Sequence, residues 1–148
     1  GESRNSPRGN EKTAEYLNVA EFIVLKSTAF HLDTIISPVF DVHNELCFLI
    51  ACLELLENHS RMRLQEFSKK RGVPLIAIPP EEAIGTQAEL GSFAVNCMPL
   101  PGYLVGSAEV KTQQVNDALK ENNIKHLVVP LTQFRLSGGS VHCLTNKL

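Results

Sequence analysis

The stretch Lys69–Ile78, which reads KKRGVPLIAI, contains the transition that decides the fold. Its three basic residues suit the last turn of a helix, where the helix dipole is negative. Gly72 can adopt the left-handed conformation that commonly ends a helix. The apolar run Val73–Ile78 then predicts a buried strand. A helix that leads directly into a strand, with a second strand to pair with it, is typical of an α/β fold.

The same transition occurs twice more along the chain. A helix with Asn10 as a candidate N-cap precedes the apolar run Phe22–Leu25, which predicts a strand. Another helix is predicted over Lys111–Lys120, ahead of a strand over Ile124–Val129. The three strand starts are evenly spaced, which indicates a repeated supersecondary unit.

Further elements are predicted around these transitions. The helix before Gly72 is expected to begin at Ser60, with Leu64 and Phe67 on one face. Two prolines and two glutamates at Pro79–Glu82 predict a short helical turn. Other apolar runs predict strands at Leu32–Phe40, Leu46–Cys52, Phe93–Met98, Tyr103–Gly106 and Ser140–Thr145.

Composition excludes several classes of protein. The chain has 148 residues, about one domain, and 43% of them are hydrophobic, enough for a packed core. With 14 Lys and Arg against 16 Asp and Glu, the net charge of −2 argues against nucleic-acid and polybasic membrane proteins. The longest apolar stretch, Leu46–Leu56, is interrupted by Glu54 and is too short to cross a bilayer. No signal segment opens the chain, so we expect a cytoplasmic location.

The four cysteines stand in no CxxC pair and at no zinc-finger spacing. We therefore expect free thiols in a reducing compartment and no metal. Cys47, Cys52 and Cys97 are expected to pack in the core as small hydrophobic residues. Cys143 differs because it follows the Gly138-Gly139 pair, which permits a tight turn and close approach of a ligand.

Reactive residues occur at matching places in the repeat. His31 and Asp33, then Asn96, then Cys143 each lie in a predicted strand that follows one helix–strand unit. If the units pack around one axis, these strands face one another at the centre. Cys143 would then be a nucleophile, activated by the imidazole of His31 or of His142.

The roles of the neighbouring residues stay open at this level. Asp33 is expected on the same strand face as His31, where it orients the imidazole or binds a cationic substrate. His142 is expected on the face opposite Cys143, in a structural role, and Asn96 either lines the centre or has an ordinary role in a turn or at the end of a strand ladder. The competing interpretation makes Cys143 a core thiol and His31 a buried, hydrogen-bonded histidine.

Two motifs carry a family resemblance. Phe30–Thr34, FHLDT, and Gly138–Thr145, GGSVHCLT, together and in this order resemble the guanidine-modifying (pentein) superfamily. That superfamily includes arginine deiminase, dimethylarginine dimethylaminohydrolase and the amidinotransferases. The opening segment Arg4–Glu11, RNSPRGNE, is similar to the arginine-bearing loop of the dimethylarginine hydrolases. The resemblance extends over essentially the whole chain.

The resemblance implies an α/β propeller of ββαβ modules around a pseudo-fivefold axis. It implies that Cys143 attacks the guanidinium carbon to form an amidino-thioether, and that His31 protonates the leaving amine and then activates water. Asp33 would bind guanidinium nitrogens with Asn96 nearby, and Arg4, or else Arg8, would bind the substrate carboxylate. No metal or other cofactor is implied.

The resemblance leaves the substrate and the reaction open. The hydrolase reading gives a citrulline-type product from arginine or a methylated arginine, with release of ammonia or an alkylamine. Asp33 replaces the lysine of the dimethylarginine hydrolases and favours arginine, whereas the Arg4–Glu11 loop favours methylarginine. The alternatives are an amidinotransferase and a catalytically silent fragment or interaction module.

The resemblance also matches residues 1–148 to the C-terminal modules of the propeller. The N-terminal modules, which supply further guanidinium-binding carboxylates, are not matched. The expected partners are therefore a small guanidino substrate together with a missing N-terminal half or a second chain. Neither nucleic acid nor a membrane is expected as a partner.

Overall fold

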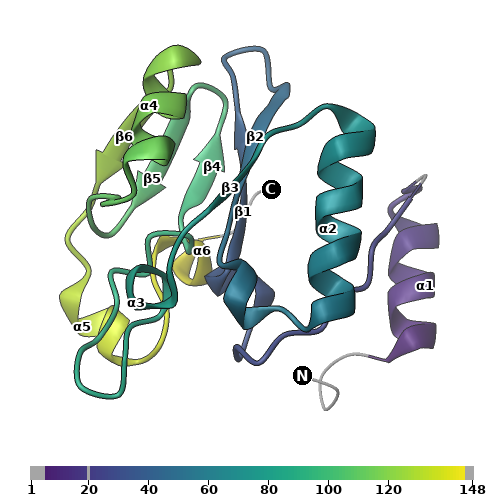
Figure 1. Cartoon of the computed structure of the whole chain (residues 1–148), viewed down its shortest axis with the longest axis horizontal. Helices are drawn as coiled ribbons and strands as arrows, with labels where there is room; N and C mark the ends of the chain where they lie inside the picture. Colours follow the sequence, from purple (N-terminus) through teal and green to yellow (C-terminus); the bar gives the residue numbers. More distant parts are fainter. Residues whose placement is uncertain (1–5, 20, 146–148) are drawn as a thin grey trace.

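The computed structural model describes residues 6–19 and 21–145 and contains two β-β-α-β modules (Figure 1). The first consists of β1 (Ile36–Phe40), β2 (Leu46–Ala51), α2 (Asn58–Arg71) and β3 (Leu75–Ala77). The second consists of β4 (Met98–Leu100), β5 (Tyr103–Gly106), α4 (Gln113–Glu121) and β6 (Lys125–Val128). This α/β architecture confirms the fold class and the module type predicted from the sequence.

Both modules have the same strand order and directions. In each, the first two strands are antiparallel, as in the pairs Ile36–Ala51 and Met98–Val105. The third strand lies parallel to the second, as in the pair Leu49–Leu75 of the first module. A parallel pair needs a long crossover connection, and α2 and α4 supply it.

The helix–strand transition around Gly72 forms as predicted. Gly72 has the left-handed conformation, with φ of +65°, and its N–H donates to the carbonyl of Lys69. The start of α2 differs, because Glu57 rather than Ser60 occupies the N-cap position. Ser60 is buried inside the helix, where its hydroxyl accepts the N–H of Lys26 at 2.8 Å. This long-range contact has no local sequence signal.

The short helix α3 (Pro80–Ala83) is also as predicted, and one of its glutamates joins the modules. Glu82 is buried, and its carboxylate accepts the backbone N–H groups of Lys111 and Thr112 at 2.6 and 3.3 Å. The Thr112 hydroxyl donates to the same carboxylate at 2.6 Å. Glu82 therefore satisfies free donors at the start of α4, as a capping residue does.

The two modules share one hydrophobic core. Strand β1 packs against β4 and β5, and α4 packs on β6. One cluster of buried side chains includes Val39, Phe48 and Ile50 of the first module and Leu104 and Val115 of the second. The modules are therefore parts of one folding unit.

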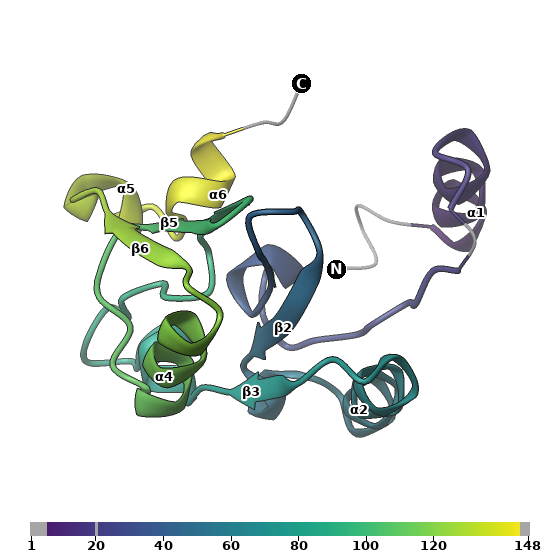
Figure 2. The same cartoon turned by 90° about the horizontal axis from the view of Figure 1, so that it is seen from above.

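The N-terminal part differs from the prediction. Helix α1 (Pro7–Tyr16) begins at Ser6, whose side chain accepts the Gly9 N–H, rather than at Asn10. It has no buried residue, and Figures 1 and 2 show it apart from both sheets. The predicted strand Phe22–Leu25 is absent and the segment runs as an extended connection. Among the described residues no strand lies beside this segment, so its backbone forms no β-ladder despite the apolar pattern.

Four other segments differ from the predictions. The segment around Asp33 is the 3-10 turn η1 (Leu32–Thr34) ahead of β1, and the residues before Met98 form a turn. The predicted last strand is the short helix α6 (Val141–Leu144), and α5 (Thr132–Leu136) was not predicted. Apolar runs this short do not distinguish a strand from a buried helical turn. Within the described ranges, no helix is long and apolar enough to span a membrane.

Candidate active site

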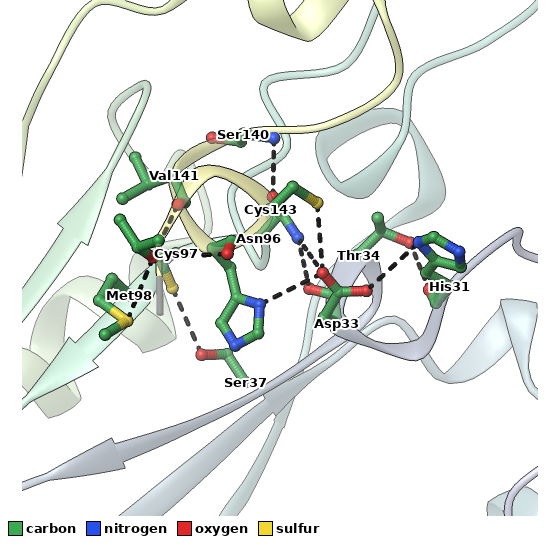
Figure 3. Close-up of polar contacts among 12 residues, drawn as sticks. His31, Asp33, Thr34, Ser37, Asn96, Cys97, Met98, Ser140, Val141 and Cys143 are labelled. Carbon is green, nitrogen blue, oxygen red and sulfur yellow. Dashed lines mark hydrogen bonds and ion pairs between the residues drawn. The ribbon is translucent and has the colours of Figure 1, made fainter. Parts of the chain in front are cut away.

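Three chain segments meet where the modules begin. Asp33 lies in η1, directly before β1, and Asn96 lies in the turn directly before β4. Cys143 lies in α6, which follows β6 and α5. Figure 3 shows the three side chains together, with Asp33 between Cys143 and His31. The expectation that matching positions of the repeat converge is met, although the segments are turns rather than strands.

The Asp33 carboxylate is the centre of this cluster. Its Oδ2 accepts the Asn96 amide Nδ2 at 2.9 Å and the Cys143 thiol at 3.3 Å. The Nδ1 atom of His142 lies 3.3 Å from the same oxygen, and Nδ1 of His31 lies 4.0 Å from Oδ1. About a quarter of the Asp33 side chain, 27%, remains exposed, so a ligand has access to it.

The nucleophile candidate Cys143 is solvent-exposed and lies on one turn of helix. Its partial burial raises the pKa of the thiol, and the Asp33 carboxylate raises it further, against opposing hydrogen bonds from Ser140 and Asn96. The resting side chain is therefore a thiol that donates to Asp33. A Cβ at Gly139 would lie 3.1 Å from the Cys143 sulfur, so the absence of a side chain at Gly139 lets Cys143 pack closely against this turn.

Both candidate imidazoles lie beside Asp33. His31 precedes η1, its carbonyl accepts the Thr34 hydroxyl at 2.6 Å, and its ring stacks on Phe30 with centroids 4.3 Å apart. The prediction that His142 faces away from Cys143 is wrong, because it assumed a strand. In a helical turn, adjacent side chains are about 100° apart, and both contact Asp33 Oδ2.

Asn96 is the most buried member of the cluster, with no exposed surface. Besides the Asp33 carboxylate, its Nδ2 donates to the Asp33 carbonyl at 3.1 Å. Its Oδ1 accepts the Ser140 N–H at 2.7 Å, and its carbonyl accepts the His142 N–H at 3.3 Å. The sequence singled Asn96 out as a polar residue at a repeat position, but nothing in it indicated these partners.

The remaining candidates lie elsewhere. Arg4 is outside the described residues, and Arg8 is on α1, which Figures 1 and 2 place far from α6. Cys52 and Cys97 are buried as predicted, whereas Cys47 is only partly buried, at the edge of the core. In the described ranges no group of three or more His, Cys, Asp or Glu side chains is arranged to hold a metal ion.

Known structures with the same architecture include an arginine dihydrolase and a protein solved with ornithine or with L-arginine bound. The N-terminal domain of ArgZ, an arginine dihydrolase from the ornithine–ammonia cycle in cyanobacteria, superposes in its substrate-bound form with a TM-score of 0.73 at 20% identity, over 96% of this chain. AgrE in complex with ornithine and NAD+ superposes with a TM-score of 0.63 at 20% identity, over 81% of this chain. The chain has the pentein fold.

The likeness to these pentein structures covers only part of each of them. The chain spans 47% of the ArgZ N-terminal domain and 16% of AgrE. No protein-family model matches the sequence, and neither does any curated protein. At this level of identity the shared pentein fold is established, and the activity of this chain has to be argued from its own residues.

Proposed function

We propose that this chain carries the nucleophile-bearing part of a cysteine hydrolase that acts on the guanidino group of arginine or a methylated arginine. The observation that carries the proposal is the 3.3 Å contact between the Cys143 sulfur and the Asp33 carboxylate. A carboxylate binds a guanidinium by charge-assisted, often bidentate hydrogen bonds. A guanidinium held there lies beside a cysteine, the side chain best suited to attack its carbon.

In the proposed reaction, the incoming cation changes the state of the thiol. The same carboxylate that raises the pKa of Cys143 is neutralised when it pairs with the guanidinium. The positive charge beside the sulfur then favours the thiolate, which adds to the guanidinium carbon. In the proposal the thiol proton passes to His31, which carries it to the leaving amine; His142, 3.3 Å from the same carboxylate, is the alternative acceptor and would then supply that proton itself.

The later steps use His31 in the proposal. The carbon–nitrogen bond breaks as His31 protonates the leaving ammonia or alkylamine, and an amidino-thioether remains on Cys143. His31 then takes a proton from water, which adds to the same carbon. The carbon–sulfur bond breaks, the thiol is restored, and a citrulline-type ureido product leaves.

We further propose that residues 1–148 correspond to C-terminal modules of a larger site. The support is that the chain spans less than half of the ArgZ N-terminal domain. A missing N-terminal half or a second chain would supply further guanidinium-binding groups, and Arg4 is the proposed clamp for the substrate carboxylate. The free thiols agree with a reducing compartment such as the cytoplasm.

The proposal is tested by measuring which cysteine reacts with 2-chloroacetamidine, whose amidinium resembles a guanidinium. Intact-mass spectrometry of the whole chain should show fast labelling at a single site. The Cys143→Ser variant should lose that labelling, and His31→Ala should slow it by about tenfold. Cys47→Ser removes a partly buried thiol elsewhere and should leave the rate unchanged.

The outcomes separate the alternatives. Slow labelling spread over several cysteines would contradict an assembled site and support a silent fragment or interaction module. If the site labels as expected, incubation with arginine and an acceptor amine distinguishes the two enzyme classes. Citrulline identifies a hydrolase, whereas ornithine with an amidinated amine identifies an amidinotransferase.

A further inference from the structure

The Asn96 side chain joins the two halves of the candidate site. One hydrogen-bonding end, Nδ2, donates to Asp33 at 2.9 Å and 3.1 Å, while the other, Oδ1, accepts the Ser140 N–H at 2.7 Å. Asp33 and Ser140 belong to segments that are remote in sequence and lie on either side of the Asn96 side chain (Figure 3). The full capacity of the amide to donate is therefore used within the site.

Burial makes these bonds obligatory. Asn96 and Ser140 have no exposed surface, so water cannot replace a lost partner. A buried polar group left without a hydrogen bond is costly, which favours the one arrangement that satisfies all of them. That arrangement fixes the position of the Asp33 carboxylate relative to Ser140, which directly precedes helix α6 and its Cys143.

The backbone around Asn96 is itself held in one conformation. Phe93, which begins the turn, has a φ of +54°, a left-handed value that is unusual for a bulky residue. The Asn96 N–H donates to the Phe93 carbonyl at 3.0 Å, and the Asn96 carbonyl accepts the His142 N–H. Such strained conformations persist where the surroundings over-determine them, often at functional sites.

The Ser140 side chain is held by a second contact, which does not involve Asn96. The Ser140 hydroxyl donates to the hydroxyl of Ser107, which follows β5, at 2.6 Å. This bond holds Ser140 to the second module but not to Asp33. Asn96 thus connects Ser140 to the Asp33 carboxylate, whereas Ser107 connects Ser140 to the second module.

We propose that Asn96 is a positioning residue that holds the Asp33 carboxylate in a fixed position relative to helix α6. A guanidinium bound by the carboxylate then lies against the Cys143 sulfur. The proposal rests on the proposed function and assigns a role within it. Because Asn96 is fully buried, it acts through its hydrogen bonds to Asp33 and Ser140 and its contact with the Cys143 thiol rather than by touching substrate.

The test compares two alkylating reagents of similar size on the whole chain. The cationic 2-chloroacetamidine uses the alignment of carboxylate and sulfur, whereas neutral 2-chloroacetamide reports only the reactivity of the thiol. The ratio of the two rates at Cys143 therefore measures alignment. We expect Asn96→Ala to lower this ratio by about tenfold or more, since misplacement of reacting groups by about 1 Å costs up to about a hundredfold.

The Asn96→Asp variant separates the donor function of the amide, toward Asp33, from its acceptor function, toward Ser140. It is isosteric and keeps an acceptor for the Ser140 N–H, but its carboxylate cannot donate to Asp33 and repels it. We expect the ratio to fall at pH 8 and to recover toward pH 5, where a proton shared between the two carboxyl groups restores a donor. Asn96→Ala, which has no such group, should show no recovery relative to the wild type.

The control variant is Asn116→Ala. Asn116 also donates its amide to a backbone carbonyl, that of Val110 at 2.9 Å, but lies outside the site. It should leave the ratio unchanged, and circular dichroism of every variant checks folding. An unchanged ratio in folded Asn96→Ala or Asn96→Asp at pH 8 would refute the positioning role. A wild-type chain without preference for the amidine would instead refute the proposed function.

Discussion

At the residue scale, the candidate site is built around one carboxylate with several hydrogen-bond donors. Asp33 Oδ2 accepts both an amide and a thiol, and two imidazoles lie within 4.0 Å of the carboxyl group. In the proposed reaction, a guanidinium that binds this carboxylate competes with the Cys143 thiol for it. The proposal therefore links substrate binding and activation of Cys143 through the same oxygen.

Cys97 provides a separate test of how burial affects a thiol. The side chain lies in the core beside Ser37, and burial raises its pKa from 9.0 to about 11. In the unfolded chain the thiol ionises near its ordinary value, while in the folded protein it keeps its proton. The unfolded state then binds fewer protons, so the free energy of unfolding falls as pH rises through this window. Cys97 alone should account for a loss of about 2 kcal/mol by pH 11.

The measurement is urea denaturation of the wild type and of Cys97→Ala between pH 8 and 10.5. The variant should be less stable at pH 8 but should lose less stability as the pH rises. Equal slopes for the two proteins would show that the Cys97 thiol ionises as readily in the folded state as in the unfolded state. A Cys47→Ala variant, which changes a partly buried thiol, serves as the matched comparison.

At the element scale, the short helix α6 exposes Cys143, the candidate nucleophile. The turn before it includes Gly138, whose φ of +83° favours glycine, and Gly139, above which the Cys143 sulfur lies. A strand in this place would have directed His142 and Cys143 to opposite faces. The helical turn instead directs both toward Asp33.

Gly139→Ala tests the close approach of α6 to the preceding turn. The new Cβ would lie 3.1 Å from both Cβ and Sγ of Cys143, so the nucleophile must shift by a few tenths of an ångström. We expect the amidine labelling rate of Cys143 to fall by about tenfold. Gly9→Ala is the matched control, because its Cβ would lie 3.1 Å from the Ser6 hydroxyl in α1, away from the site. A rate equal to wild type in Gly139→Ala would show that the approach is not needed.

The predicted elements are confirmed where the local sequence signals are strong. The end of α2 at Gly72, the strand Tyr103–Gly106 and the turn at Pro80 depend on glycine, proline and apolar runs that act over a few residues. The segments around Asp33 and Cys143 were predicted as strands and are helical turns. Their conformation depends on hydrogen bonds to distant residues, which local propensity does not represent.

At the scale of the whole molecule, the two modules share a single hydrophobic core. Their strands are formed from separate parts of the chain, yet buried residues of β1, β2 and β5 belong to the same cluster. Small domains with one core commonly unfold in a single cooperative step. Helix α1, which buries none of its residues, lies outside this cooperative unit.

Hydrogen exchange should therefore show the same opening free energy for β2 and β5, and little protection in α1. Leu104→Ala, a truncation in β5 of a side chain with no exposed surface, should lower the protection of both strands by about 3 kcal/mol. Tyr103→Ala, on the exposed side of the same strand, should lower it much less. Reduced protection confined to β5 in Leu104→Ala would show that the modules unfold separately.

The sequence by itself determined two of the three predicted helix–strand transitions, the α/β class and the residue types available for chemistry, because these depend on neighbours within a few positions. It also brought His31, Asp33, Asn96 and Cys143 forward as one group through their matching places in the repeat. Only the tertiary structure decided that His142 joins them, that Asn96 is buried between Asp33 and Ser140, and that Cys143 lies on a helical turn. Those features depend on contacts between segments far apart in the chain, whose energies appear only once the core has brought the segments together.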